Sequence, residues 1–139
     1  MKWLIDSIKK HLTSNLSPSI MFAPVKADML DIGANNKQKK SIAVRMIPSA
    51  PGEQYFEGEI KNKQFQILVK SENQLEVITS IEAIAEALNN VHRCVFNAID
   101  SSYTLIRLNV YVEPNFVEKT AANEWIYTAL FSVELEKGG

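Results

Sequence analysis

Apolar residues near the start of the chain recur every three or four positions, with polar residues between them. The set consists of Leu4, Ile5, Ile8, Leu12 and Leu16. This spacing is the period of an amphipathic helix and predicts one over residues 3–16. Ser17-Pro18 should end it, because the residue before a proline avoids the helical conformation. Residues 31–40 carry a glycine, two asparagines and three lysines, and they predict a flexible loop.

Apolar and polar residues then alternate in three short stretches, which is the pattern of half-buried strands. These stretches are residues 41–47, 55–60 and 64–70. Pro48 should end the first strand, and Pro51-Gly52 suits the two central positions of a type II turn. Residues 61–63 have the length of a hairpin connection between the second and third strands, and Asn62 is suited to a positive φ there.

The hydrophobic period changes back to that of a helix after Ser71. The stripe contains Val77, Ile78, Ile81, Ile84, Ala85 and Leu88. It predicts a helix over residues 74–90 whose apolar face packs on a core. Ser71 and Gln74 match a capping box, in which each side chain satisfies the other residue's backbone N–H group at a helix start. Residues 91–102 fit either a helix or an extended chain and receive no assignment.

Two longer alternating stretches follow, and both predict strands. They cover residues 103–112 and 125–135. Pro114 should end the first, because proline cannot donate to a strand ladder. Residues 114–124 then predict a loop longer than the roughly two to five residues that a hairpin needs, and loops of excess length are usually functional or disordered. Phe116 and Val117 are its apolar residues, so we expect this loop to contact another protein.

The order helix, strands, helix, strands predicts an α+β fold. We expect an antiparallel or mixed sheet of about four to five strands, with two helices packed on one face. The other face mixes apolar and polar residues, namely Leu68, Leu105, Tyr111, Ile126 and Leu130 with Gln66, Arg107 and Ser132. Such a face suits contact with another protein or a second copy of the chain. The alternative is that loops such as residues 17–40 fold over it.

The length of 139 residues fits one domain, residues 1–139, with one core. Cys94 is the only cysteine, which excludes a disulfide framework within one chain and favours a reducing compartment. No run approaches the roughly 18 apolar residues of a membrane span, and early charged residues exclude a signal peptide. The net charge is −1, so the overall charge gives no indication of binding to nucleic acid or to a membrane. We expect a soluble protein without membrane contact.

The residue patterns favour a protein that is not an enzyme. His11 and His92 lie far apart, and the five glycines form no nucleotide-binding or hydrolase motif. Three glutamates near the last loop are interpreted as solvated charges, because acid–base catalysis needs a partly desolvated cleft; they are Glu113, Glu118 and Glu124. We therefore predict no catalytic, cofactor-binding or metal-binding residues.

A basic cluster lies in the loop at residues 31–40. Its members are Lys37, Lys39 and Lys40. No aromatic residues are interleaved with them, so base stacking is not indicated. A solvated loop is favoured, and contact with DNA phosphates stays open as the alternative.

Three stretches that follow the N-terminal helix together resemble a known family. They are "SIAVRMIPSAPGEQYFEGE" (41–59), "KQFQILVKSENQLEVITSIEAIAEAL" (63–88) and "EPNFVEKTAANEWIYTALFSVEL" (113–135). In this order they resemble the small minor capsid proteins of tailed phages and prophages of Gram-positive bacteria. These proteins are similar to the tail terminator proteins of long-tailed phages.

The resemblance implies a structural protein of the virion that assembles in the host cytoplasm. It implies a ring, typically a hexamer, that caps the tail tube and joins it to the head. The partners would be other copies of the chain, the tail tube protein and the head connector or completion proteins. DNA would at most pass through the ring, past the cluster of Lys37, Lys39 and Lys40. Loops between strands would make the contacts, with Pro48, Pro51, Gly52, Phe116, Val117, Glu118 and Lys119 as candidates.

Two other classes stay open. A small non-enzymatic module could bind protein or nucleic acid; an RNA-binding sheet needs aromatics on adjacent central strands beside basic residues. Tyr103 and Tyr111 with Arg107 are a sparse version of that pattern. A small enzyme or ligand-binding domain would need a pocket with convergent polar groups.

Overall fold

The computed structural model describes residues 2–48, 54–55, 58–92 and 103–137. These residues form the helices α1 (Lys2–Asn15) and α2 (Gln74–Ala87) and the short 3-10 helix η1 (Ala34–Asn36). The strands are β1 (Val25–Ala27), β2 (Ser41–Ile47), β3 (Gln54–Tyr55), β4 (Gly58–Ser71), β5 (Val91–His92), β6 (Tyr103–Lys119) and β7 (Trp125–Lys137).

One mixed sheet joins the strands. Its order is β1-β2-β4-β7-β6-β5, and β3 pairs with β4 beside this path. The four long strands β2, β4, β7 and β6 pair antiparallel, whereas β1 is parallel to β2. This arrangement confirms the predicted α+β class with a mixed sheet. β1 is missing from the sequence-based prediction, because three residues are too few to show a hydrophobic period.

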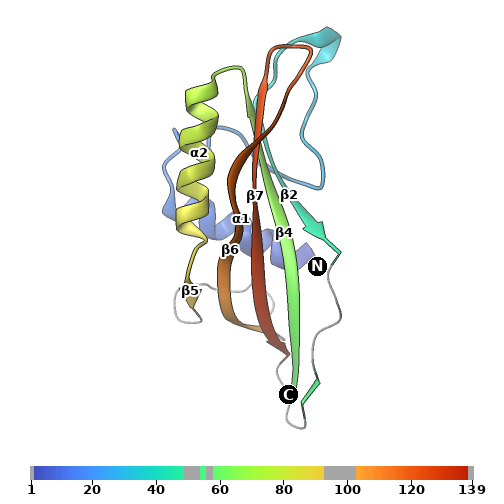
Figure 1. The fold of residues 1–139 in the computed structure, drawn as a ribbon, viewed down its shortest axis with the longest axis vertical. Helices are drawn as coiled ribbons and strands as arrows, with labels where there is room; N and C mark the ends of the chain where they lie inside the picture. The colour runs from blue at the N-terminus through green and yellow to red at the C-terminus, as the bar shows by residue number, and fades with distance from the viewer. Residues whose placement is uncertain (1, 49–53, 56–57, 93–102, 138–139) are drawn as a thin grey trace.

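Both helices pack on one face of the sheet over a common core. α2 runs along the strands, and α1 crosses them (Figure 1). The fully buried helix residues include Leu4, Ile8, Leu12, Val77, Ile81, Ile84 and Leu88. Within this core, Phe65 of β4 stacks on Phe131 of β7 with ring centroids 5.1 Å apart. The helical stripes predicted from the sequence are therefore confirmed as core faces, except for Ile78, which is only partly buried and is not part of the core.

β4 is one continuous strand, so the predicted hairpin turn at residues 61–63 is wrong. Asn62 lies opposite Glu134 in the ladder between β4 and β7, and it is not among the residues with positive φ. The antiparallel partner of the start of β4 is β3, where Tyr55 pairs with Gly58. The lower ends of β4 and β7 extend beyond the two helices (Figure 1). Polar residues are tolerated there, so the sequence of residues 61–63 resembles that of a turn although it forms a strand.

Asn73, and not Ser71, caps the N-terminus of α2. The Asn73 side chain accepts a hydrogen bond from the Glu76 N–H group at 3.2 Å. The Ser71 hydroxyl donates to the Glu76 carboxylate at 2.8 Å and accepts from the Asn73 N–H group at 3.1 Å. The predicted capping box between Ser71 and Gln74 is therefore wrong by two residues. Glu76 stands three residues after the true cap, which is the spacing of a capping box.

β6 continues through Pro114 to Lys119, so the predicted loop at residues 114–124 is wrong. Residues 120–124 alone connect β6 to β7, and the Thr120 N–H group donates to the Glu124 carbonyl at 2.8 Å across this turn. Pro114 lies in one of four register irregularities of the β6–β7 ladder, on a part of β6 that β5 does not cover. A bulge on an edge strand tolerates proline, because the missing N–H group is not needed there.

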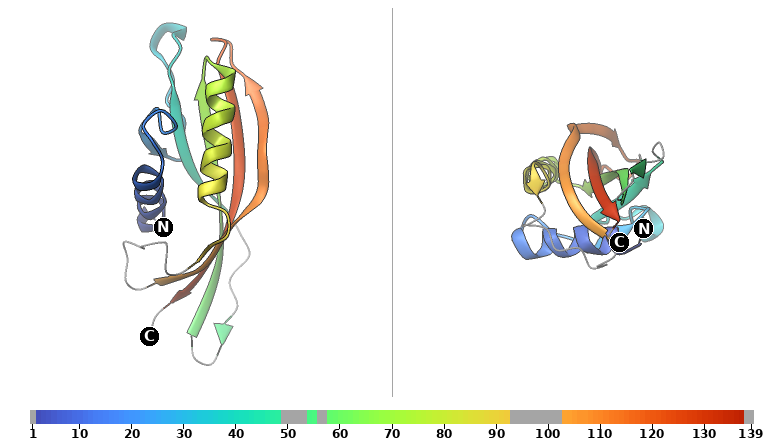
Figure 2. Two further views of the ribbon diagram at one scale, coloured as in Figure 1. Left: turned by 90° about the vertical axis from the view of Figure 1, so that its left-hand side faces the viewer. Right: turned by 90° about the horizontal axis from the view of Figure 1, so that it is seen from below.

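The same irregularities change which residues of β6 face the core. Leu105 and Leu108 are both buried and lie opposite Leu135 and Val133, although strict alternation would put them on opposite faces. Val112 is turned to the other face. The predicted faces of this strand are therefore wrong, because each extra residue in a bulge reverses the alternation that follows. Bulges also bend a strand, and β6 is strongly curved (Figure 2).

Candidate functional site

Residues 28–40 lie over the second face of the sheet, and we call them the strap. The strap and the β6–β7 turn meet at one end of the molecule (Figure 1). In this region Lys70 of β4 and Ile126 of β7 are only 3% and 7% exposed. The alternative that a loop covers the mixed sheet face is therefore correct at this end of the sheet.

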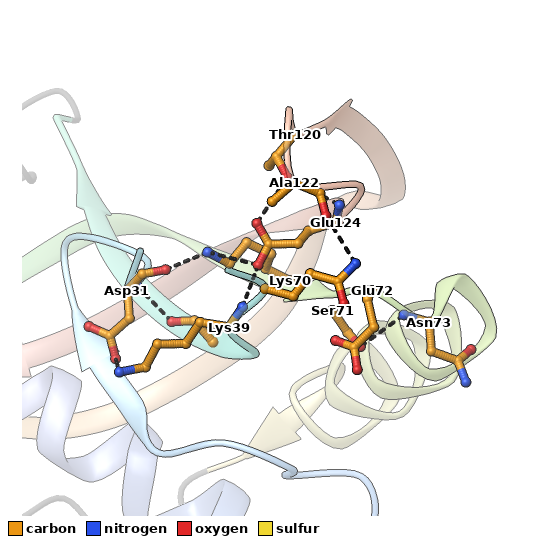
Figure 3. A network of polar contacts seen from close by, with 11 residues as sticks. Asp31, Lys39, Lys70, Ser71, Glu72, Asn73, Thr120, Ala122 and Glu124 are labelled. Atoms are coloured by element: carbon orange, nitrogen blue, oxygen red, sulfur yellow. Dashed lines mark hydrogen bonds and ion pairs between the residues drawn. The ribbon is translucent and has the colours of Figure 1, made fainter. Parts of the chain in front are cut away.

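A buried ion pair holds the strap to the sheet (Figure 3). Lys70 Nζ lies 3.5 Å from Glu124 Oε2 and donates a hydrogen bond to the Asp31 carbonyl. The same carboxylate accepts from the Lys39 N–H group at 2.7 Å and from the Thr120 hydroxyl at 2.9 Å. The pair thus joins three chain segments, which are the strap, β4 and the β6–β7 turn.

Two further hydrogen bonds fix the strap. The Asp31 N–H group donates to the Ser41 hydroxyl at 2.9 Å, at the start of β2. The Gln38 side chain donates to the Ala122 carbonyl at 3.0 Å, in the β6–β7 turn. Both bonds join the strap to parts of the chain that the sheet already holds in place.

Glu124 is ionised in spite of its burial. It is 4% exposed, so its interpretation as a solvated charge is wrong. Burial alone would raise the pKa of this carboxyl, but the Lys39 N–H group, the Thr120 hydroxyl and the Lys70 ammonium outweigh it, and the pKa lies below the ordinary 4.5. Glu124 therefore stabilises the folded protein above the unfolded pKa, and this contribution is lost as the pH falls through the folded pKa.

The Lys39 amide should report this titration directly. Because its N–H group donates to the Glu124 carboxylate, its NMR chemical shift should change when that group is protonated. We expect a midpoint below 4.5, since the pKa of Glu124 is lowered. The transition should disappear in Glu124→Gln. A midpoint at or above 4.5 in the wild type would contradict the ionised, hydrogen-bonded carboxylate.

The basic cluster lies on the strap, and two of its lysines form ion pairs. The Lys40 Nζ atom lies 2.9 Å from Glu76 Oε1 and donates a hydrogen bond to it. This hydrogen bond raises the pKa of Lys40 and lowers the pKa of Glu76. Lys39 lies 4.0 Å from Asp31. Lys37 is exposed and borders an open pocket of about 340 Å³ between the strap and the β6–β7 turn. The prediction of a solvated cluster is therefore only partly correct, because Lys39 and Lys40 form ion pairs within the protein.

The candidate contact residues at the end of β6 are exposed, and two of them, Phe116 and Lys119, lie against aromatic side chains. Phe116 and Val117 are 50% and 44% exposed. The Phe116 ring makes edge contacts with Trp125 and Tyr127, at centroid distances of 6.0 and 5.6 Å. The Lys119 ammonium lies 4.7 Å from the Trp125 ring centroid. Phe116 therefore packs partly on its own sheet and keeps half of its surface exposed.

The remaining predicted site residues are scattered. Pro48 and Glu118 are exposed, and Pro51 and Gly52 lie outside the described residues. Within the described ranges, no group of three or more His, Cys, Asp or Glu side chains is arranged to hold a metal ion. None of the helices described is long and apolar enough to cross a membrane.

The fold itself is similar to that of a chain in a solved structure of a "virion of native gene transfer agent (GTA) particle". The TM-score is 0.67 at 14% sequence identity, over 96% of this chain and 94% of that chain. At this identity the likeness shows a shared α+β fold. A comparison with curated protein sequences gives no significant match.

Residues 22–137 match a family model described as bacteriophage tail terminator protein. The match covers most of the chain, so the protein belongs to the bacteriophage tail terminator family, as the resemblance of its sequence implied. It is a structural protein of the phage virion and not an enzyme. The strap, β6 and the β6–β7 turn all lie inside the matched residues.

Proposed function

We propose that this protein ends the phage tail. It forms a hexameric ring that caps the tail tube, stops its growth and offers the surface to which the head connector joins. The match of residues 22–137 to the tail terminator family carries the proposal. The partners are then other copies of the chain, the tail tube protein and the connector or completion proteins of the head. Assembly takes place in the host cytoplasm, and the ring remains in the virion.

The sheet topology is compatible with a ring. β1 and β2 lie at one edge of the sheet, and β6 and β5 lie at the other, so the two edges are different surfaces. A head-to-tail interface joins two unlike patches of the same chain, and it forms a ring when its rotation closes. A chain with two unlike edges meets that requirement.

The end of β6 is the contact surface that we propose. Phe116, Val117, Glu118 and Lys119 are exposed there, and covering the two apolar side chains with a partner would be favourable. Pro48, which follows β2, is exposed near the opposite edge. The β6–β7 connection has ordinary hairpin length, so its length does not indicate a contact. The proposal rests on the exposure of these side chains instead.

DNA meets the ring at most while it passes through. Lys37 is the strap lysine that we propose to face it, because Lys39 and Lys40 are paired with Asp31 and Glu76. A few screened charges of this kind would act on passing phosphates without binding one sequence.

Removal of the protein from the phage or prophage that encodes it tests the function. A stop codon early in its gene should give tails longer than those of the wild type and heads without tails, because nothing ends tube growth. Electron microscopy measures both, and purified protein added to the lysate should restore joining. Tails of normal length attached to heads would contradict the proposal. A ring of another symmetry in images of intact tails would contradict the hexamer alone.

A further inference from the structure

We propose that the strap opens as one unit and that the Lys70–Glu124 ion pair controls this opening. The first observation is the difference in burial across the contact. No side chain of the strap that the structure describes is buried, and Met29 and Ile32 are 67% and 82% exposed. Lys70 and Glu124, which the strap contacts, are 3% and 4% exposed. The strap thus covers charged groups and contributes little apolar surface of its own to the core.

Polar contacts hold the strap in its closed position. The strap is held through Asp31, Gln38 and Lys39, each by hydrogen bonds to another segment, and at its end by the ion pair of Lys40 with Glu76. Segments held by few buried apolar contacts open at a lower free energy than the whole protein unfolds. Opening also returns Lys70 and Glu124 to water, which relieves the desolvation penalty of a buried ion pair. Both effects favour opening of the strap while the sheet stays folded.

The two ends of the strap are fixed in the sheet. Asp28, its first residue, has a φ of 70°, and its N–H group donates to the Val44 carbonyl at 2.8 Å. Ser41, which follows the strap, is opposite Lys70 in the ladder between β2 and β4. The segment between these points can therefore move away as a loop, and its movement uncovers Lys70, Glu124 and Ile126.

Amide hydrogen exchange of the full chain tests the opening. The Asp31 and Lys39 amides report the closed strap, because they donate to Ser41 and Glu124. The slowest amides of β4 and β7 report global unfolding. We expect the two strap amides to exchange at least about tenfold faster than those sheet amides. Equal rates would overturn the proposal, since the strap would then open only when the protein unfolds.

Two variants test control by the ion pair. Glu124→Gln leaves the Lys70 ammonium buried without its counter-charge, so exchange of the strap amides should rise at least about tenfold and stay faster than exchange of the slowest sheet amides. Lys70→Met combined with Glu124→Gln removes the unpaired charge and should recover most of the protection of the Asp31 amide. Strap amides that keep their wild-type rates or exchange only as fast as the sheet amides in the single variant, or no recovery in the double variant, would overturn this control.

Gly33→Ala perturbs the strap directly and leaves the ion pair unchanged. It therefore tests the opening even if Glu124→Gln does not fold. A Cβ atom at Gly33 would lie 1.9 Å from the Lys37 carbonyl oxygen, so the closed strap could not keep its path. The Asp31 and Lys39 amides should exchange faster and should remain less protected than the slowest sheet amides. Unchanged strap amides, or strap amides that exchange at the same rate as the slowest sheet amides, would contradict a strap that opens by itself.

Discussion

Truncation of Ile81 to alanine is expected to lower the free energy of unfolding by about 2–5 kcal/mol, the range for removal of a large buried aliphatic side chain. Ile81 is fully buried on the core face of α2. This helix packs against β4, β6 and β7, and a cavity between a helix and three strands cannot collapse without moving one of them. Urea denaturation, extrapolated to water, measures the loss.

Thr79→Ala is the matched control for this truncation. Thr79 is exposed two residues earlier on the same helix, so its replacement should change the free energy of unfolding by less than about 0.5 kcal/mol. The opposite pattern for Ile81→Ala, normal stability with failed tail assembly, would show that the stripe is an interface and that the core assignment is wrong.

Replacement of Phe116 and Val117 together by serine is expected to leave the fold intact and to prevent tail completion. Phe116 would lose its edge contacts with Trp125 and Tyr127, and aromatic contacts of this kind contribute about 0.5–1.5 kcal/mol each. The melting temperature should therefore fall by a few degrees only. Tails should become abnormally long or fail to join heads, because the proposed contact surface loses both apolar side chains. Calorimetry and electron microscopy of lysates measure the two effects.

Tyr111→Ser is the control for this double variant. Tyr111 is on the same strand and is 62% exposed, but it lies outside the proposed contact, so tails should end and join heads normally. A large drop in melting temperature for the double variant, together with normal tails at a permissive temperature, would make Phe116 and Val117 core residues. The contact surface of β6 would then be withdrawn.

The helices and central strands could be predicted from the sequence, because each buries one face on a common core. β2 covers residues 41–47 as predicted, and α2 begins at Gln74 as predicted and ends three residues earlier, at Ala87 rather than Asn90. A periodic burial of this kind leaves a periodic pattern in the residues themselves. The local residue pattern is therefore sufficient to predict such elements.

The strap and the second half of β6 could not be predicted, because distant segments decide them. Lys39 and Glu124 are 85 positions apart, yet the hydrogen bond between them helps to bury the carboxylate. In the sequence, Lys70 and Glu124 are ordinary surface charges next to apolar residues. In the same way, Pro114 predicts the end of a strand. In the structure β6 continues past it, because its pairing with β7 resumes after a change of register.

The irregular edge of β6 has a consequence for solubility. A long strand with a free edge normally presents a regular row of N–H and C=O groups, on which further strands can add without limit. Four register shifts and Pro114 interrupt that row. An edge interrupted in this way is a poor template for the addition of further strands, so the fold limits the growth of fibres from β6.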